Sequence, residues 1–171
     1  MDGTERIRTT LERAAAVVAR RPAVGQGTAT TKAVLGRGLE CEVSEGPFRF
    51  TVGMSEKYGG TDSAPNPGIY GRGALASCLV LGIAMWAARM EVPLDALEVE
   101  VEADYDVRGE LGVSPDVPAG YGAMRYAIRA TSRAPEDKVR EMLDRAVRTS
   151  SLVDDFSRAV PVTGRIAING R

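Results

Sequence analysis

Residues 59–102 read GGTDSAPNPGIYGRGALASCLVLGIAMWAARMEVPLDALEVEVE and combine a long apolar run with an alternating one. Between Arg72 and Arg89 lie sixteen residues without a charge, which predicts a buried helix from about residue 70 to about residue 90. Sixteen residues are fewer than the roughly 20 needed to cross a bilayer, so we expect no membrane span. The glycines and prolines of residues 57–73 predict an ordered loop of the kind that often carries function.

The segment that follows this helix alternates strictly between apolar and charged residues. Its apolar positions are Leu97, Val99, Val101, Ala103, Tyr105 and Val107. One apolar and one charged face indicate a strand of an antiparallel sheet with one side in water. A second strand over residues 124–131 carries Arg125 and Arg129, which we expect to lie opposite the acidic row of the first.

The N-terminal half of the chain contains a further helix and a further set of strands. Apolar residues at helical spacing over residues 4–20 predict an amphipathic helix. Three short alternating runs within residues 28–52, separated by turn residues, predict three strands. We therefore expect an N-terminal helical extension, residues 1–27, followed by one domain over residues 28–171.

The C-terminal part is expected to hold a helix, a break and a strand. Pro135 marks the start of a second amphipathic helix. Residues 149–155 predict a break before a short turn, and residues 160–168 predict a closing strand. Because the runs of strands are set apart from the helices, the order of elements favours the α+β class.

Composition excludes several classes of site. The 171 residues include no histidine, which removes Ser-His-Asp and Cys-His catalytic pairs and every metal site that needs histidine. Cys41 and Cys78 are the two cysteines, too few for a four-cysteine zinc site or a disulfide framework. We expect no metal and no cofactor.

The net charge and the first residues of the chain indicate which partners and which cellular compartment to expect. A net charge of −1 lacks the basic field of a nucleic-acid-binding domain, so we expect neither nucleic acid nor a membrane as a partner. The first ten residues, MDGTERIRTT, carry charges where a signal peptide needs an apolar segment. Lone cysteines also fit a reducing compartment, and we expect a cytoplasmic protein.

The two cysteines are the main candidates for chemistry. Cys78 lies in an apolar run and Cys41 on the apolar face of an alternating one. Free cysteine is among the most buried residue types, so composition alone favours a packing role for each. A reactive Cys78 would need a helix N-terminus or a nearby cation to stabilise its thiolate. Cys41 shares the apolar face of a short strand with Leu39 and Val43.

Residues 59–102 resemble the OsmC/Ohr family, named for osmotically inducible protein C and organic hydroperoxide resistance proteins. Pro65, Pro67 and Cys78 fall at the family's spacing, and an acid-rich strand follows the helix. The segment 139–162, which ends in AVPV, is similar to the family's last helix and its exit. The resemblance implies an OsmC-like fold, with antiparallel sheets packed on a long buried central helix, and an intertwined homodimer with its sites at the subunit interface.

The family is known for thiol-dependent reduction of organic hydroperoxides, an antioxidant activity. A first cysteine becomes a sulfenic acid and a second condenses with it to a disulfide, while an arginine and a glutamate organise the first thiolate. The resemblance places the first cysteine at Cys78 and the arginine at Arg37. The glutamate position falls on Ile69 and the second cysteine position on Ser150.

Two functional hypotheses therefore stay open. The first is a one-Cys thiol peroxidase, with Cys78 as nucleophile and Arg37 as its cation, which needs an external thiol because Ser150 forms no disulfide. Cys41 could stand in for the missing thiol only if it came within disulfide distance. The second is a non-catalytic member of the family that binds a small apolar ligand near Ile69, Tyr70 and Cys78.

Overall fold

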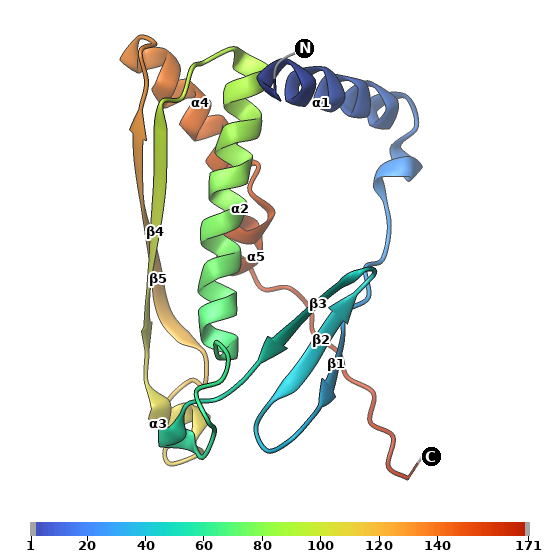
Figure 1. Cartoon of the computed structure of the whole chain (residues 1–171), viewed down its shortest axis with the longest axis vertical. Coiled ribbons are helices and arrows are strands. Elements are labelled where there is room, and N and C mark those ends of the chain that lie inside the picture. The colour runs from blue at the N-terminus through green and yellow to red at the C-terminus, as the bar shows by residue number, and fades with distance from the viewer. Residues whose placement is uncertain (1–2, 170–171) are drawn as a thin grey trace.

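A computed structural model describes residues 3–169 of the chain. The helices are α1 (Gly3–Arg20), α2 (Pro67–Met90), α3 (Val107–Glu110), α4 (Glu136–Arg148) and α5 (Ser151–Ser157), with short 3-10 turns η1 (Pro22–Gly25) and η2 (Glu56–Tyr58). The strands are β1 (Lys32–Leu35), β2 (Cys41–Glu45), β3 (Phe48–Val52), β4 (Ala96–Tyr105) and β5 (Tyr121–Thr131). The architecture is α+β, as predicted (Figure 1).

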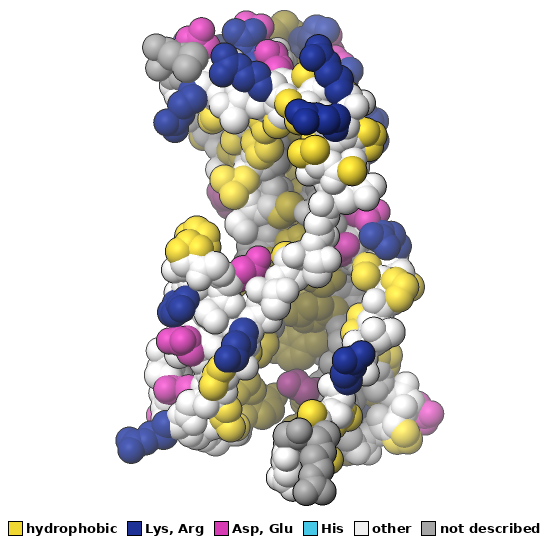
Figure 2. Space-filling model, turned by 90° about the vertical axis from the view of Figure 1, so that its right-hand side faces the viewer, with side chains coloured by type: hydrophobic (Ala, Val, Ile, Leu, Met, Phe, Trp, Pro, Cys, Tyr) yellow, Lys and Arg dark blue, Asp and Glu magenta, His cyan; other side chains and the backbone are white. Residues whose placement is uncertain are grey.

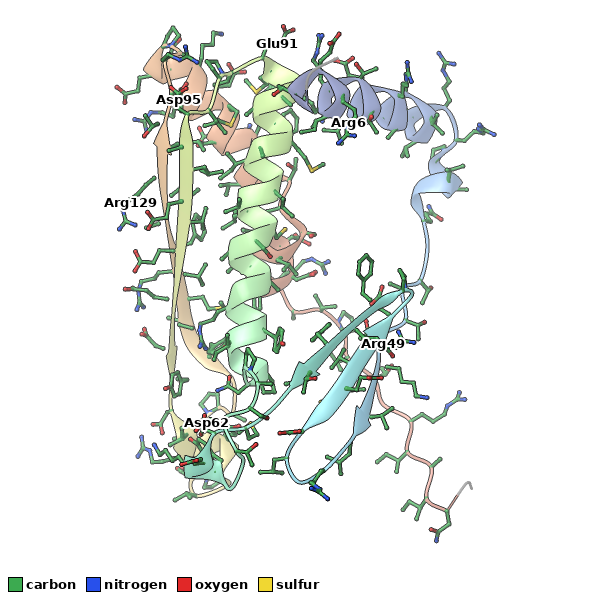
Figure 3. All side chains as sticks on the ribbon, in the orientation of Figure 1. Arg6, Arg49, Asp62, Glu91, Asp95 and Arg129 are labelled. Atoms are coloured by element: carbon green, nitrogen blue, oxygen red, sulfur yellow. The ribbon has the colours of Figure 1, made fainter. Side chains whose placement is uncertain are left out.

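The strands form two separate antiparallel sheets, one of three strands in the order β1-β2-β3 and one of two strands, β4-β5. In the two-stranded sheet the predicted pairing of arginines with the acidic row is confirmed. Arg129 contacts Glu98 at 2.9 Å and Glu100 at 3.1 Å, and its side chain points away from α2 in Figure 3. The opposite, apolar face of this sheet is therefore the one that packs on the helices.

Helix α2 is the central element, and it starts earlier than residue 70. The side chain of Asn66 accepts the N–H of Ile69 at 3.0 Å, and Pro67 occupies the first turn, where its missing N–H costs nothing. By length and composition α2 would also pass for a membrane span, a test that core helices of soluble proteins meet as well.

The core lies where one face of α2 meets α4 and the β4-β5 sheet (Figure 1). Its buried members are Ile83, Ala87, Val92, Met142 and Ala146, and Val99 and Ile128 of the sheet pack against them. Within the single chain, however, the opposite face of α2 is covered only near its C-terminal end, where Ala88 is 2% exposed. Further along this opposite face, Leu81 is 63% exposed and Met85 is 41% exposed.

The three-stranded sheet stands beside the lower half of α2 and makes few contacts with it (Figure 1). The hydroxyl of Tyr70 donates to the carbonyl of Thr51 at 2.7 Å, and the rings of Phe50 and Tyr70 lie 4.9 Å apart. Hydrophobic side chains are visible in the opening between this sheet and α1 (Figure 2). The sheet and the exposed face of α2 thus border a gap that this one chain does not fill.

Helix α1 matches the predicted N-terminal helix closely, and crosses the C-terminal end of α2 (Figure 1). Arg8 pairs with Glu91 at 3.1 Å, and Glu91 is labelled at this junction in Figure 3. None of the residues of α1 is buried. The division of the chain at residue 27 stays a prediction.

Two predictions for the C-terminal part are wrong. Residues 160–168 form no strand, because no ladder of backbone hydrogen bonds joins them to a strand of the described chain; Val162 is 92% and Ile166 87% exposed. The expected break over residues 149–155 is confined to Thr149 and Ser150, after which the chain enters α5.

Candidate functional site

The Cys78 thiol lies on α2 where it faces the junction of α4 and α5. Its sulfur is half-buried, and two hydroxyls lie within hydrogen-bond distance of it. The Oγ atom of Ser150 is 3.4 Å away and that of Ser151 is 3.7 Å away. The resemblance places the second cysteine of the family at Ser150, and the structure brings that position to the sulfur of Cys78.

Ser150 acts as the N-cap of α5. Its Oγ accepts the N–H of Val153 at 3.3 Å, so the hydroxyl proton is free to be donated to the sulfur of Cys78. Ser150 is 6% exposed and is the buried polar residue among those described. A buried hydroxyl normally has its hydrogen bonds satisfied, and here the cap and the thiol supply both partners.

These contacts change the acidity of Cys78. Burial is the largest single influence and raises the pKa of the thiol, but four hydrogen bonds together outweigh it. They come from the hydroxyls of Ser150 and Ser151 and from the backbone at Ser151 and Leu152. Hydrogen bonds to sulfur favour the thiolate, so the pKa of Cys78 lies below its ordinary value. The site can therefore present a nucleophilic sulfur.

The other residues singled out from the sequence are not next to this thiol in the chain. Arg37 is exposed in the turn between β1 and β2, and the hydrogen bonds at Cys78 do not include it. Ile69 lies in the first turn of α2 with 47% exposure. It is about two and a half helical turns from Cys78, so the two side chains lie on opposite sides of α2. Cys41 is a free thiol on β2.

Helix α5 is the element of the candidate site that the sequence did not predict. The sequence from Ser150 onward contains a cap signal, since serine is a preferred N-cap residue and Asp154 adds an acid in the first turn. The short length of α5, Ser151–Ser157, and the paired serines made a break the simpler interpretation.

Among residues 3–169, no group of three or more Cys, Asp, Glu or His side chains is arranged to hold a metal.

The sequence model of the OsmC-like protein family matches residues 60–164, which include α2, Cys78 and Ser150. The chain belongs to the OsmC-like protein family. The matched segment contains the central helix, the two-stranded sheet and the α4–α5 junction, so the resemblance stated from the sequence is confirmed. Among curated protein sequences, none matches this chain.

Solved structures share the OsmC-like fold. An OsmC-like protein from Mycoplasma pneumoniae is 15% identical, with a TM-score of 0.65 over 77% of this chain and 89% of that one. A protein from Legionella pneumophila described as an organic hydroperoxide resistance protein OsmC is 19% identical, with a TM-score of 0.52 over 75% and 88%. One from Elizabethkingia anophelis, also described as an organic hydroperoxide resistance protein, is 14% identical, with a TM-score of 0.55 over 75% and 87%. At these identities the likeness establishes the fold.

Proposed function

We propose that this OsmC-like protein is a one-Cys thiol peroxidase, which reduces organic hydroperoxides through Cys78. The observation that carries the proposal is the set of hydrogen bonds around the sulfur, from Ser150, Ser151 and the backbone at the start of α5. A thiolate, rather than a thiol, is the nucleophile that attacks peroxides. The half-buried position of Cys78 leaves part of its sulfur open to such a substrate.

The first half of the reaction follows from this arrangement. The thiolate of Cys78 attacks the outer oxygen of the hydroperoxide, a sulfur–oxygen bond forms and the oxygen–oxygen bond breaks. The sulfur is oxidised to a sulfenic acid, and the peroxide leaves as an alcohol after its alkoxide takes a proton from solvent. Ser150 and Ser151 stabilise the charge on sulfur before the attack.

The second half requires a thiol from outside the chain. Ser150 occupies the position next to Cys78 from which a second cysteine would act, and a hydroxyl forms no disulfide. Cys41, on β2, forms no disulfide with Cys78 in the structure, so an external thiol takes the recycling role in this proposal. A small or protein thiol, of the kind a reducing cytoplasm supplies, attacks the sulfenic acid and releases water; a second thiol then frees Cys78 as the external disulfide forms.

The same proposal includes a homodimer. The face of α2 opposite the core is uncharged, with Ala74 and Ser77 exposed beside Leu81 and Met85. An exposed apolar stripe on the central helix is unfavourable in water, and a second copy of this chain would cover it. Cys78 lies at the edge of this stripe. Arg37, which does not reach Cys78 within its own chain, is retained as the cation that the second copy would bring.

The alternative of an apolar-ligand pocket at Ile69, Tyr70 and Cys78 has less support. The cavity of about 300 Å³ near the start of α2 is lined by none of these three residues.

The proposal is tested by treating the protein with cumene hydroperoxide and trapping sulfenic acid with dimedone before mass spectrometry. We expect the label on Cys78 and steady peroxide consumption when dithiothreitol is supplied. Cys78→Ser should abolish both, whereas the matched variant Cys41→Ser should keep both. Recovery of Cys78 in its reduced, unlabelled form after peroxide treatment would overturn the proposal.

A further inference from the structure

A cavity of about 300 Å³ lies at the lower end of the molecule, apart from Cys78. It is open on one side and bordered by η2, the first turns of α2, the end of β4 with α3, and the segment that leads into β5. Asp62, labelled in Figure 3, lies at this lower end of the molecule. Its volume equals that of about ten waters and lies at the lower end of the roughly 300–1,000 Å³ typical of small-molecule sites. The cavity therefore has room for a ligand of about one ring.

Arg72 supplies the positive charge of this cavity. Its guanidinium donates to the hydroxyl of Tyr121 at 3.2 Å, and that hydroxyl in turn donates to the carbonyl of Gly68 at 3.1 Å. Within residues 3–169, Arg72 makes no ion pair with a carboxylate. A half-buried guanidinium fixed by one neutral partner keeps donors available in the fork geometry that carboxylates fit.

The remaining lining is mostly aromatic and apolar. Tyr58, Tyr105 and Tyr121 contribute rings, and Met54 and Val107 contribute aliphatic surface. Flat rings around one fixed cation suit a planar apolar body that carries a single anionic group.

Close backbone packing holds two walls of the cavity in place. A Cβ atom at Gly60 would overlap the backbone of Met54, and one at Gly109 would overlap the carbonyls of Val117 and Pro118. Asp62 adds a hydrogen bond, accepting the N–H of Glu56 at 3.1 Å. These contacts fix η2 and the segment after α3, so the cavity exists before any ligand enters it.

Glu110 is the acidic residue that lines the cavity. It is exposed on α3, so solvent screens its charge, whereas Arg72 is half-buried. Of the two charges, Arg72 has the stronger influence on a ligand inside the cavity. These two charges favour a ligand with a single negative charge. A zwitterion is less suited, because its ammonium group would have to pair with the solvent-screened Glu110.

We propose that this cavity binds a small aromatic carboxylate, with its carboxylate on Arg72 and its ring among Tyr58, Tyr105 and Tyr121. The site is separate from the thiol chemistry and does not depend on it. Tyr121 is a positioning residue in this account, because it orients the guanidinium through its hydroxyl.

The test measures binding by calorimetry in the Cys78→Ser protein, which makes the result independent of peroxidase activity. Benzoate should bind, and benzyl alcohol should bind at least about tenfold more weakly, because it lacks the charge that Arg72 recognises. Arg72→Met should weaken benzoate binding by a similar factor. The matched control Arg6→Met, which changes an exposed arginine on α1, should leave it unchanged.

Two further measurements keep the test decisive. Tyr121→Phe, which preserves the ring and the fold, should weaken benzoate more than benzyl alcohol, and circular dichroism should confirm that every variant is folded. Equal affinity for benzoate and benzyl alcohol, or unchanged benzoate binding in Arg72→Met, would overturn the proposal. Tighter binding of phenylalanine than of benzoate, lost in Glu110→Gln, would overturn the monoanion assignment.

Discussion

The Oγ atom of Ser150 lies 3.4 Å from the Sγ atom of Cys78. This contact joins the central helix to the cap of α5, since the same oxygen accepts the N–H of Val153. A hydroxyl here favours the thiolate of Cys78 but forms no bond to its oxidised form. In the proposed peroxidase, Ser150 would therefore help to activate Cys78 but would not take part in its recycling.

Ser150→Cys should restore the missing recycling step. The two sulfurs would face each other across the present contact, and peroxide treatment should yield an intramolecular disulfide. Mass spectrometry without reductant should show a cross-linked peptide that joins Cys78 to the substituted position. Ser157→Cys, at the far end of α5, is the matched control and should give none; an uncross-linked Ser150→Cys protein after peroxide treatment would contradict the assigned geometry.

Met142→Ala should destabilise the fold. Met142 is 0% exposed on α4 and packs in the core against Ile83 of α2. Truncation of a buried methionine costs about 2–5 kcal/mol through lost burial and the cavity that remains. Urea unfolding should give a lower free energy of unfolding by that amount. Val24→Ala, at a position that is 61% exposed, should change it by less than about 0.5 kcal/mol; equal losses in the two variants would count against the core described above.

Leu81→Arg should separate the proposed homodimer. Leu81 is 63% exposed in the single chain, on the face of α2 away from the core, and an arginine there would place an unpaired charge in the interface. Light scattering should give a mass of about twice 18.2 kDa for the unaltered protein and 18.2 kDa for the variant. Leu111→Arg, also at an exposed position, should stay dimeric. A monomeric unaltered protein would refute the dimer.

The elements with strong periodicity were predictable from the sequence. Helix α1, the helical run of α2 and the alternation of β4 were each specified by local pattern. The ion pairs of Arg129 with Glu98 and Glu100 also followed, because strict alternation in two antiparallel neighbours fixes which residues face each other. These features depend on the sequence pattern within one element and on the pairing of β4 with its neighbour β5.

The elements that depend on longer-range context were not predictable. Residues 160–168 have the pattern of a strand, yet a strand needs a neighbour that pairs with its backbone groups, and none of the described strands pairs with this segment. Helix α5 is short, and its start is fixed by the cap at Ser150. The cavity around Arg72 was not predicted because its walls come from four separate segments. No local sequence pattern shows that Arg72, at the start of an apolar run, contacts Tyr121.

The pH dependence of Cys78 reactivity tests the central claim most directly. The rate of reaction with cumene hydroperoxide, followed from pH 5 to 10, reports the thiolate fraction. Because the hydrogen bonds at the sulfur lower the pKa of Cys78, the midpoint of the rise should lie below that of free cysteine measured in the same buffers, and the reaction at neutral pH should be faster than that of free cysteine. Ser150→Ala and Ser151→Ala should each move the midpoint upward and slow the reaction at pH 7. The control Ser77→Ala should do neither, because the hydroxyl of Ser77 donates to the carbonyl of Ala74 and not to the sulfur. A midpoint in the unaltered protein at or above that of free cysteine, and unchanged in Ser150→Ala, would contradict the account.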